Sequence, residues 1–552
     1  MSADNLGFLL RGPKGLHVYK GVENPKQILH YEATPPDDVR VVEYSNNGAY
    51  LAFCDTKKTY LLDAETGAQL IEHDLPKPTY IKFSPKDNYF LTWEQYVIYG
   101  LRRTKDGQLR TPNPNLNFFS VKDKKYVKTI IARRTFDIPE WTADEKYLIG
   151  INGSEIHVSD GGTFEYLRTI STIPGVSQIS VSPHMGIHIF AAYVPEEKNG
   201  TPARIELRSA DVDKKIGNQI TVAQCDQMKF LWNSKGTAVI ASATIDVDVT
   251  GASYYGRTTL HVIDWNGQSN RVNLDKQGPV HDVKWSPVGN FFAVAYGIVP
   301  AKCAVFNIRG QVHWDLGEGS RNEVFFNPQG SILATCGFGS IASGKTTLWD
   351  VEKQTEINTI YISNTTTMNF SPDGKHFFTA ITAPRMRVDN CYRLWDYQGK
   401  LLFEHNPTTE RFDLWEVKWQ PRPGAQPFTV KVPTAEEKKK TGLKVVVSNG
   451  KTVAAGAVKA AGAYVPPHLR GKNSNVGAMK PVGAVPVAEK SHNEKELLKT
   501  QKIVKQIQIL KERQAKNEKL EKTQLEKIEK EEQLLKELAE LQIKVAEEKA
   551  AN

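Results

Sequence analysis

Short apolar segments recur along this chain in a fixed order. Residues 368–379 show the unit, an apolar strand, a Ser-Pro-Asp-Gly turn and a second apolar strand. Pro372 fixes φ at the first central turn position and Gly374 tolerates a positive φ, so the chain must reverse between two pairing strands. A further strand then ends in Trp395-Asp396. The pattern predicts one portion of an antiparallel sheet.

The same unit recurs through the first three quarters of the chain. We define the anchor residue of a unit as the apolar residue just before its turn. Successive anchors are separated by 39 to 58 residues, close to the roughly 40–45 residues of a four-stranded propeller blade. The sequence therefore predicts an all-β fold, a nine-bladed WD40-type β-propeller. The nine anchors are Tyr44, Phe83, Trp141, Val181, Trp232, Trp285, Phe326, Phe370 and Trp419.

The ring must close, because a blade cannot bury both of its faces alone. The ninth unit opens near Val417, and residues 7–19 form a hairpin without an opening strand of its own. We expect these N- and C-terminal strands to share one blade, with Val430 and residues 443–447 as further strand-like material. Two separate smaller propellers are disfavoured, since no linker-like stretch interrupts residues 20–420.

Residues 339–346 fit the phosphate-binding loop G-x-x-x-x-G-K-[ST], with Lys345 and Thr346 in the last two positions. That loop needs a helix after it, because the helix N-terminus supplies the anion site. Here the loop is followed by Thr347-Leu-Trp349-Asp350, the ending strand of a unit. The context predicts a hairpin turn.

No other catalytic constellation is evident. H-E-x-x-H, G-x-S-x-G and metal-spaced Cys or His clusters are absent from the sequence. We therefore expect no enzymatic activity, no cofactor and no metal, and a hydrogen-bonding role for histidines such as His184 and His188. The 5 dispersed cysteines suit a reducing compartment and buried thiols. No apolar run is long enough to span a membrane.

The net charge of +9 is concentrated after the repeats, since residues 434–492 hold ten Lys or Arg against three Glu. We predict three regions: the propeller at 1–433, a disordered basic linker at 434–490 and a charged α-helical tail at 491–552. Linker lysines would bind RNA phosphates in a salt-sensitive, sequence-independent way, although a purely solubilising linker stays open. The candidate RNA- or ribosome-binding residues are Lys438, Lys439, Lys440, Lys444, Lys451, Lys459, Arg470, Lys472 and Lys480.

Two apolar features of the tail region suit partner docking. Residues 463–471 hold an apolar island that two prolines keep extended, a form that fits a groove. The tail begins with a capping box at Ser491 and Glu494, and its interrupted apolar stripe suits a helix that pairs on binding a partner. The candidate docking residues are Tyr464, Val465, Pro466, Pro467, Leu469, Ile503, Ile507, Leu510, Leu525, Ile528, Leu535 and Leu538.

The combination of these features resembles the eukaryotic translation initiation factor 2A family, and the resemblance spans essentially the whole chain. The most specific segment is Gly-Ala-Tyr-Val-Pro-Pro-His-Leu-Arg at 462–470, together with Trp349-Asp350 and Trp395-Asp396. Similar Tyr-Val-Pro-Pro-His-Leu-Arg segments occur in the tails of DEAD-box helicases, so the order of the regions matters as much as this peptide.

The resemblance implies a monomeric, cytoplasmic, non-enzymatic factor. It would help bring initiator methionyl-tRNA to the small (40S) ribosomal subunit without GTP, on selected mRNAs or under stress. Its tail helix would contact other initiation factors. Two alternatives remain: a generic WD-repeat scaffold for protein assembly, and the propeller subunit of another initiation complex, initiation factor three. That second protein carries an N-terminal RNA-recognition domain, for which residues 1–7 leave no room.

Overall fold

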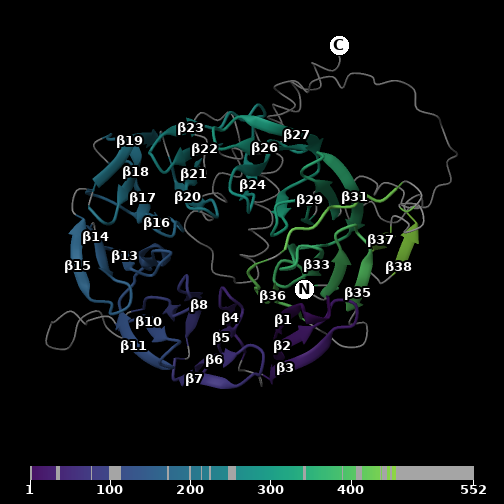
Figure 1. The fold of residues 1–552 in the computed structure, drawn as a ribbon, viewed down its shortest axis with the longest axis horizontal. Helices are drawn as coiled ribbons and strands as arrows, with labels where there is room; N and C mark the ends of the chain where they lie inside the picture. The colour runs from purple at the N-terminus through teal and green to yellow at the C-terminus, as the bar shows by residue number, and fades with distance from the viewer. Residues whose placement is uncertain are drawn as a thin grey trace, which may run out of the picture. The chain divides into compact units, whose positions relative to one another are not determined.

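The fold is a ring of four-stranded antiparallel sheets, one of which is extended by two further strands, seen in a computed structural model (Figure 1). All described residues belong to the unit Met1–Ala461. The structure describes residues 3–32, 38–75, 77–97, 113–153, 155–170, 173–197, 200–212, 214–222, 225–245, 257–339, 344–387, 389–405, 413–424, 426–434, 437, 444–447 and 451–454.

Each blade runs from an innermost to an outermost strand, and we number the blades in ring order. Blade 1 is β4 (Val41–Tyr44), β5 (Tyr50–Cys54), β6 (Thr59–Asp63) and β7 (Gln69–His73). Blade 2 is β8 (Pro78–Phe83), β9 (Tyr89–Glu94), β10 (Leu116–Ser120) and β11 (Lys125–Ile130). Blade 3 is β12 (Glu140–Trp141), β13 (Tyr147–Asn152), β14 (Glu155–Asp160) and β15 (Tyr166–Ile170).

Blade 4 is β16 (Gln178–Val181), β17 (Ile189–Val194), β18 (Ala203–Ser209) and β19 (Lys214–Val222). Blade 5 is β20 (Gln227–Trp232), β21 (Ala238–Ile245), β22 (Arg257–Asp264) and β23 (Ser269–Arg271). Blade 6 is β24 (Val280–Trp285), β25 (Phe291–Tyr296), β26 (Ala301–Asn307) and β27 (Val312–Gly319).

Blade 7 is β28 (Glu323–Phe326), β29 (Ile332–Gly337), β30 (Lys345–Asp350) and β31 (Thr355–Ile362), extended by β37 (Lys444–Val447) and β38 (Lys451–Ala454). Blade 8 is β32 (Thr367–Phe370), β33 (His376–Ile381), β34 (Cys391–Asp396) and β35 (Leu401–His405). Blade 9 is β36 (Glu416–Trp419), β1 (Gly7–Gly12), β2 (Gly15–Lys20) and β3 (Lys26–Glu32). Two 3-10 turns, η1 (Ala3–Asn5) and η2 (Thr135–Asp137), complete the elements described.

The turn in blade 8 shows how the sequence builds each hairpin. The Ser371 hydroxyl donates to Asp373 and accepts the backbone N–H of His376, while Gly374 takes the positive φ of 69° that the reversal requires. The strands that follow place Trp395 in the blade core, where its indole donates to Thr379 at 2.9 Å. The predicted strand, turn and Trp-Asp strand are confirmed.

Every predicted anchor residue is the last residue of an innermost strand. At that position an indole can reach the preceding blade. Trp285 donates to the Leu231 carbonyl at 2.7 Å, and Trp419 donates to the Asn369 carbonyl at 3.1 Å. The rings also fill the apolar layers between blades. The predicted nine-bladed propeller is confirmed for the part of the chain that the structure describes.

One face of the ring carries the turns between the first and second strands of the blades, and we call it the turn face. A side chain that follows an anchor on this face donates to a glycine carbonyl in the next blade. Because these carbonyls lie in tight turns, each bond fixes the spacing of two neighbouring blades. The bonds are Ser182 to Gly236 at 2.8 Å, Asn233 to Gly289 at 2.9 Å, Asn327 to Gly374 at 3.3 Å and Gln420 to Gly48 at 2.7 Å.

Blade 9 joins the two ends of the propeller, as predicted. Strand β1 pairs with β36 in antiparallel register from Phe8↔Trp419 to Arg11↔Glu416, and the two residues of the second pair also form an ion pair at 2.9 Å. Figure 1 shows purple β1–β3 beside green β36. The fourth strand is β3, so the suggestion that Val430 or residues 443–447 would complete this blade is wrong.

His188 joins blades 3 and 4. Its two ring nitrogens lie 2.9 Å from carboxylate oxygens of Asp144 and Asp211, and its ring is buried. Burial alone would raise the pKa of Asp144, but hydrogen bonds from Thr142 and His188 outweigh it and hold this pKa at about 2. His184 accepts the backbone N–H of Ile187. The predicted hydrogen-bonding role of both histidines is confirmed.

The five cysteines are free, and all but Cys225 are buried. Burial raises the pKa of the Cys391 thiol to about 11 and of the Cys303 thiol to about 11, so these groups stay protonated near neutral pH. Among the described residues, no helix has the length and apolar character needed to cross a membrane.

Candidate interface at the strap and tail

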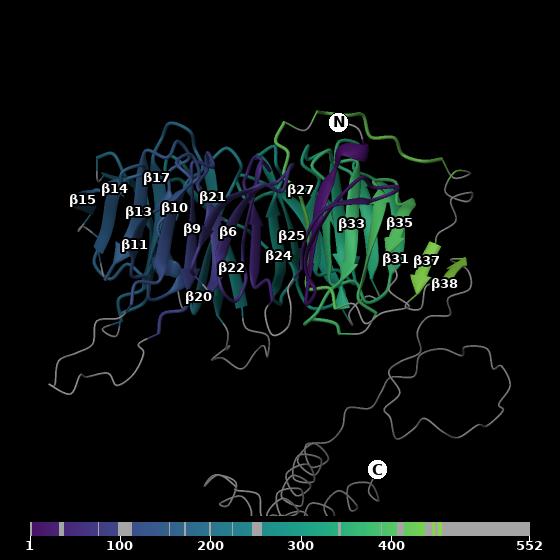
Figure 2. The same cartoon turned by 90° about the horizontal axis from the view of Figure 1, so that it is seen from below.

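After β36 the chain crosses the turn face as an extended segment, described for residues 420–424 and 426–434, which we call the strap. Figure 2 shows it as a green trace along the edge that also carries the N-terminus. Phe428 packs its ring 5.3 Å from that of Tyr397, with the Lys375 ammonium 5.2 Å from its centre. Val430 is 7% exposed and belongs to the core of blades 7 and 8. Apolar burial therefore holds the strap to two neighbouring blades.

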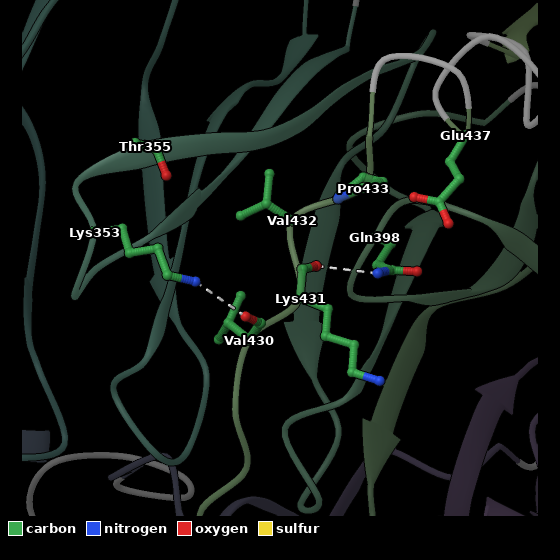
Figure 3. A pocket seen from close by; sticks show the side chains of 8 residues that line it. All are labelled: Lys353, Thr355, Gln398, Val430, Lys431, Val432, Pro433 and Glu437. Carbon is green, nitrogen blue, oxygen red and sulfur yellow. Dashed lines mark hydrogen bonds between the residues drawn. The ribbon is translucent and has the colours of Figure 1, made fainter.

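Side chains from both blades donate to strap carbonyls. Gln398 of blade 8 donates to the Lys431 carbonyl at 3.0 Å, and Lys353 of blade 7 donates to the Val430 carbonyl at 3.4 Å (Figure 3). These two strap carbonyls thus have hydrogen-bond donors although the strap does not join a sheet. These contacts hold residues 430 and 431 on blades 7 and 8.

A pocket of about 690 Å³ lies between the strap and the two blades. Its charged lining comprises Lys353, Lys431 and Glu437, and Thr355, Gln398, Val430, Val432 and Pro433 complete it (Figure 3). This lining includes neither His nor Cys, so it lacks the usual partners of a nucleophile and base pair. Such a cleft is suited to holding chain segments by apolar and polar contacts.

Two of the predicted RNA-binding residues of the linker fall within the described part of the chain, Lys444 at the start of β37 and Lys451 at the start of β38. Strand β37 runs parallel to β31, with Tyr361↔Val445 and Ile362↔Val446 in register, and pairs with β38 in a hairpin. Residues 444–447 and 451–454 of the predicted linker therefore form strands, and disorder of the rest of the linker stays a prediction. The edge of blade 7 accepts linker residues 444–447 as an added strand.

The remaining predicted site residues lie outside the described residues, so their roles stay predictions. They are Lys438, Lys439, Lys440, Lys459, Arg470, Lys472 and Lys480, the docking peptide Tyr464, Val465, Pro466, Pro467 and Leu469, and the helix residues Ile503, Ile507, Leu510, Leu525, Ile528, Leu535 and Leu538.

A second pocket, of about 410 Å³, lies between the innermost strands of blades 6 and 7. Its carboxylates already have structural partners. Asp282 accepts the Val324 N–H at 3.1 Å, and Glu323 pairs with Arg385 at 3.2 Å. Burial raises the pKa of Glu323, although Arg385 opposes that shift. Within the described residues no group of three or more His, Cys, Asp or Glu could hold a metal ion.

The loop that resembles a phosphate-binding motif connects two strands of blade 7. Strands β29 and β30 pair in antiparallel register up to Gly337↔Lys345, and the Gly344 N–H donates to the Gly337 carbonyl. The segment after Lys345 is a strand, so the dipole of a following helix is not available to an anion there. The predicted hairpin is confirmed.

The sequence reasoning missed the strap as a binding element. A signal was present, because Phe428, Val430 and Val432 alternate with polar residues, the period of an extended segment with one buried face. Of these three residues only Val430 was predicted to be strand-like. It was considered for blade 9, whereas it packs in the core of blades 7 and 8.

Comparisons with known proteins agree with this architecture. The family model described as eukaryotic translation initiation factor eIF2A matches residues 221–417. The chain is 35% identical to eukaryotic translation initiation factor 2A of Caenorhabditis elegans, across 98% of this chain and 100% of that protein. It is 32% identical to the protein of the same name in Drosophila melanogaster, across 84% of this chain and 72% of that protein.

A solved structure titled as the crystal structure of the eukaryotic initiation factor is also similar. It superimposes with a TM-score of 0.67 at 27% identity, covering 76% of this chain and 99% of that chain. This likeness supports the ring of blades described above.

Proposed function

Because this chain belongs to the eukaryotic translation initiation factor 2A family, we propose that it helps deliver initiator methionyl-tRNA to the small (40S) ribosomal subunit. Delivery would not require GTP, and would serve selected mRNAs or conditions of stress in the cytoplasm. The family assignment supports a role in translation initiation. The match to the Caenorhabditis elegans relative covers 98% of this chain, so it includes both the propeller and the tail.

In this mechanism the rigid propeller and the basic linker have separate roles. The propeller offers a fixed surface, because side-chain bonds between neighbouring blades hold its turn face. The linker that follows the strap holds ten basic against three acidic residues over 434–492, which suits RNA phosphates. The tail helix would contact mRNA, or other initiation factors through its apolar stripe.

The strap supports this division physically. It is held on blades 7 and 8 by buried Val430 and by donors from both blades, so the linker departs from one defined part of the ring. A tethered cationic segment raises the local concentration of its sites around a docked propeller. GTP independence agrees with a phosphate-loop sequence that forms a hairpin.

The test is co-sedimentation of the full chain with purified 40S subunits and labelled initiator methionyl-tRNA, without nucleotide. We expect the protein to increase the tRNA retained on the subunit, and GTP to leave that amount unchanged. Replacing Lys438, Lys439 and Lys440 by alanine should weaken retention and reduce its dependence on salt. Retention that required GTP, or that was equal without the protein, would contradict the proposal. Equal retention by the triple variant would remove the linker from the mechanism.

A further inference from the structure

Blades 2 and 3 present a group of exposed lysines that the proposed mechanism does not use. They lie on the turns of these blades and on the adjoining outermost strand β11. We call this group the lysine arc. Its members are Lys86, Lys122, Lys124, Lys125, Lys128 and Lys146.

Hydrogen bonds place the turns of the lysine arc side by side. The Val121 N–H donates to the Asn88 carbonyl at 2.9 Å, which joins the two turns of blade 2. The Lys86 N–H donates to the Glu145 carboxylate at 2.7 Å, which joins blade 2 to the turn of blade 3 that carries Lys146. The six lysines therefore share one continuous part of the surface.

Two carboxylates of the same turns are buried. Asp87, 5% exposed, accepts the N–H groups of Asn46 and Asn47 from blade 1. Glu145, 8% exposed, accepts from the backbone of Lys86 and the side chain of Asn88. Residues 84–88, 120–128, 142–147 and 160–168 hold six exposed lysines and two exposed acids, Asp123 and Glu165. A third exposed acid, Asp211 of blade 4, pairs with Lys146 at 3.5 Å. Exposed lysines therefore outnumber exposed acids on this surface, because Asp87 and Glu145 are buried in contacts within the fold.

Lys124 occupies a backbone position that suits glycine. Its φ is +53°, in the left-handed region. The corresponding turns of blades 1 and 8 have Gly67 and Gly399 at their left-handed positions, with φ of 72° and 85°. The same turns of blades 3 and 7 hold Phe164 and Gln354 at φ of 61° and 54°, so this turn accepts a side chain at a conformational cost. In blade 2 that side chain is an exposed lysine, which adds an ammonium group to the surface.

The spacing of the lysines suits a polyanion. Lys122 to Lys125 spans three residues, so their backbones lie within ~11 Å, comparable with the ~8 Å Debye length at physiological ionic strength. Their potentials therefore add. Lys128 reaches the Phe164 carbonyl of blade 3 at 2.8 Å, and Tyr166, 59% exposed, lies two residues beyond that acceptor. An exposed ring beside a cationic row is the usual arrangement for stacking an unpaired base.

We propose that the lysine arc binds the phosphate backbone of RNA as a second contact, separate from the basic linker. RNA fits better than an acidic protein, because lysine is depleted at protein interfaces whereas most contacts to nucleic acids go to phosphate and sugar. The inference rests on the proposed function in one respect, that RNA is the partner. The inference adds that the propeller itself binds RNA, through the turn face of blades 2 and 3.

The experiment compares two charge-matched variants of the full chain. Lys122, Lys124 and Lys125 are replaced by glutamate in one, and the control replaces Lys26, Lys214 and Lys235, which are exposed on blades 9, 4 and 5. Binding of a fluorescent single-stranded RNA of about 30 nucleotides is followed by anisotropy at several salt concentrations. We expect the lysine-arc variant to lose at least fivefold in affinity, with a salt slope lower by about 2, since each phosphate contact contributes roughly 0.7. The control should stay within twofold of the unchanged protein.

A second variant separates binding from folding. Lys124→Gly removes one ammonium and relieves the left-handed backbone, so it should weaken RNA binding while leaving the melting temperature unchanged or higher. A purely structural lysine would give no loss of affinity. A loss of affinity with a lowered melting temperature would count against the proposal.

Failure of this inference is distinguishable from failure of the proposed function. If the unchanged protein retains initiator tRNA on 40S subunits but the lysine-arc variant binds RNA as the control does, the lysine arc has no RNA role. If the variant keeps its RNA affinity and loses affinity for a polyglutamate peptide, the surface serves an acidic protein, which also overturns the proposal. If the oligonucleotide effect is found but tRNA is not retained on 40S subunits, the RNA surface stands and the delivery function falls.

Discussion

The side-chain amide of Gln420 donates to the backbone carbonyl of Gly48 at 2.7 Å, across 372 positions of the chain. The two residues belong to the turns of blades 9 and 1, so this bond closes the turn face of the ring. The same turns pack so closely that a methyl group at position 48 would lie 1.9 Å from the Pro421 carbonyl oxygen. The contact between blades 9 and 1 therefore leaves no space for a side chain at position 48.

Gly48→Ala should therefore destabilise the propeller through both strain and a steric clash. Gly153 is a matched control, because its φ of +66° resembles the +73° of Gly48 but nothing lies within 4 Å of its added methyl. We expect Gly153→Ala to cost about 1–2 kcal/mol through the left-handed backbone, and Gly48→Ala about 1–3 kcal/mol more through overpacking. Urea unfolding followed by tryptophan fluorescence measures both, and equal midpoints would show that the closure is not tightly packed.

The link between His188 and Asp144 predicts how stability depends on pH. The pKa of Asp144 is about 2, below its ordinary 3.8, so the ionised carboxylate stabilises the fold above about pH 4. That contribution is lost as the pH falls from about 4 to 2. Asp144→Asn should lower the melting temperature at pH 6, and the difference from the unchanged protein should shrink toward pH 2. Glu165→Gln, at an exposed carboxylate, is the control and should leave the melting temperature at pH 6 unchanged.

Loosening the strap should expose it to protease. Val430 is 7% exposed, and Val430→Ala removes buried methyl groups worth about 1.5 kcal/mol or more. Local opening should then rise about tenfold, with the rate of tryptic cleavage at Lys431 rising in proportion. Val312→Ala, at a side chain that is 52% exposed, is the control and should cleave as the unchanged protein does. Equal cleavage of both variants would mean that Val430 does not hold the strap.

The hairpin at Lys345 predicts that nucleotides do not bind this loop. Titration calorimetry with Mg-GTP and Mg-ATP should show no heat that depends on Lys345, because its backbone is paired with Gly337 in the sheet. Lys345→Ala should be indistinguishable from the unchanged protein. A binding heat in the unchanged protein that the substitution abolished would restore the phosphate-loop interpretation.

The innermost strands could be predicted from sequence because two independent signals coincide in them. An anchor such as Trp285 is apolar since it packs between blades, and the turn after it requires particular residues. The outermost strands lack an apolar anchor residue packed between blades. Strand β3 has no fully buried residue, so its sequence shows little alternation, and the missing strand of blade 9 was sought in the wrong place.

The strap and the added strand β37 depend on tertiary contacts that a local pattern does not contain. The partners of Val430 lie on blades 7 and 8, and the partner of β37 is the edge of β31. The lysine arc was missed for a different reason. Net charge was counted along the sequence, where Asp87 and Glu145 offset the lysines, whereas in three dimensions these acids are turned inward.

The shared ninth blade also determines the order in which the protein can be completed during synthesis. Strand β1 leaves the ribosome first, yet its partner β36 follows about 400 residues later, as the 405-residue separation of Arg11 and Glu416 shows. At a synthesis rate of ~5–20 residues per second, the apolar face of β1 stays exposed for roughly 20–80 s before β36 is made. A nascent chain that stalls before Glu416 therefore displays Phe8 and Leu10, which are buried in the finished ring, and chaperones can recognise them.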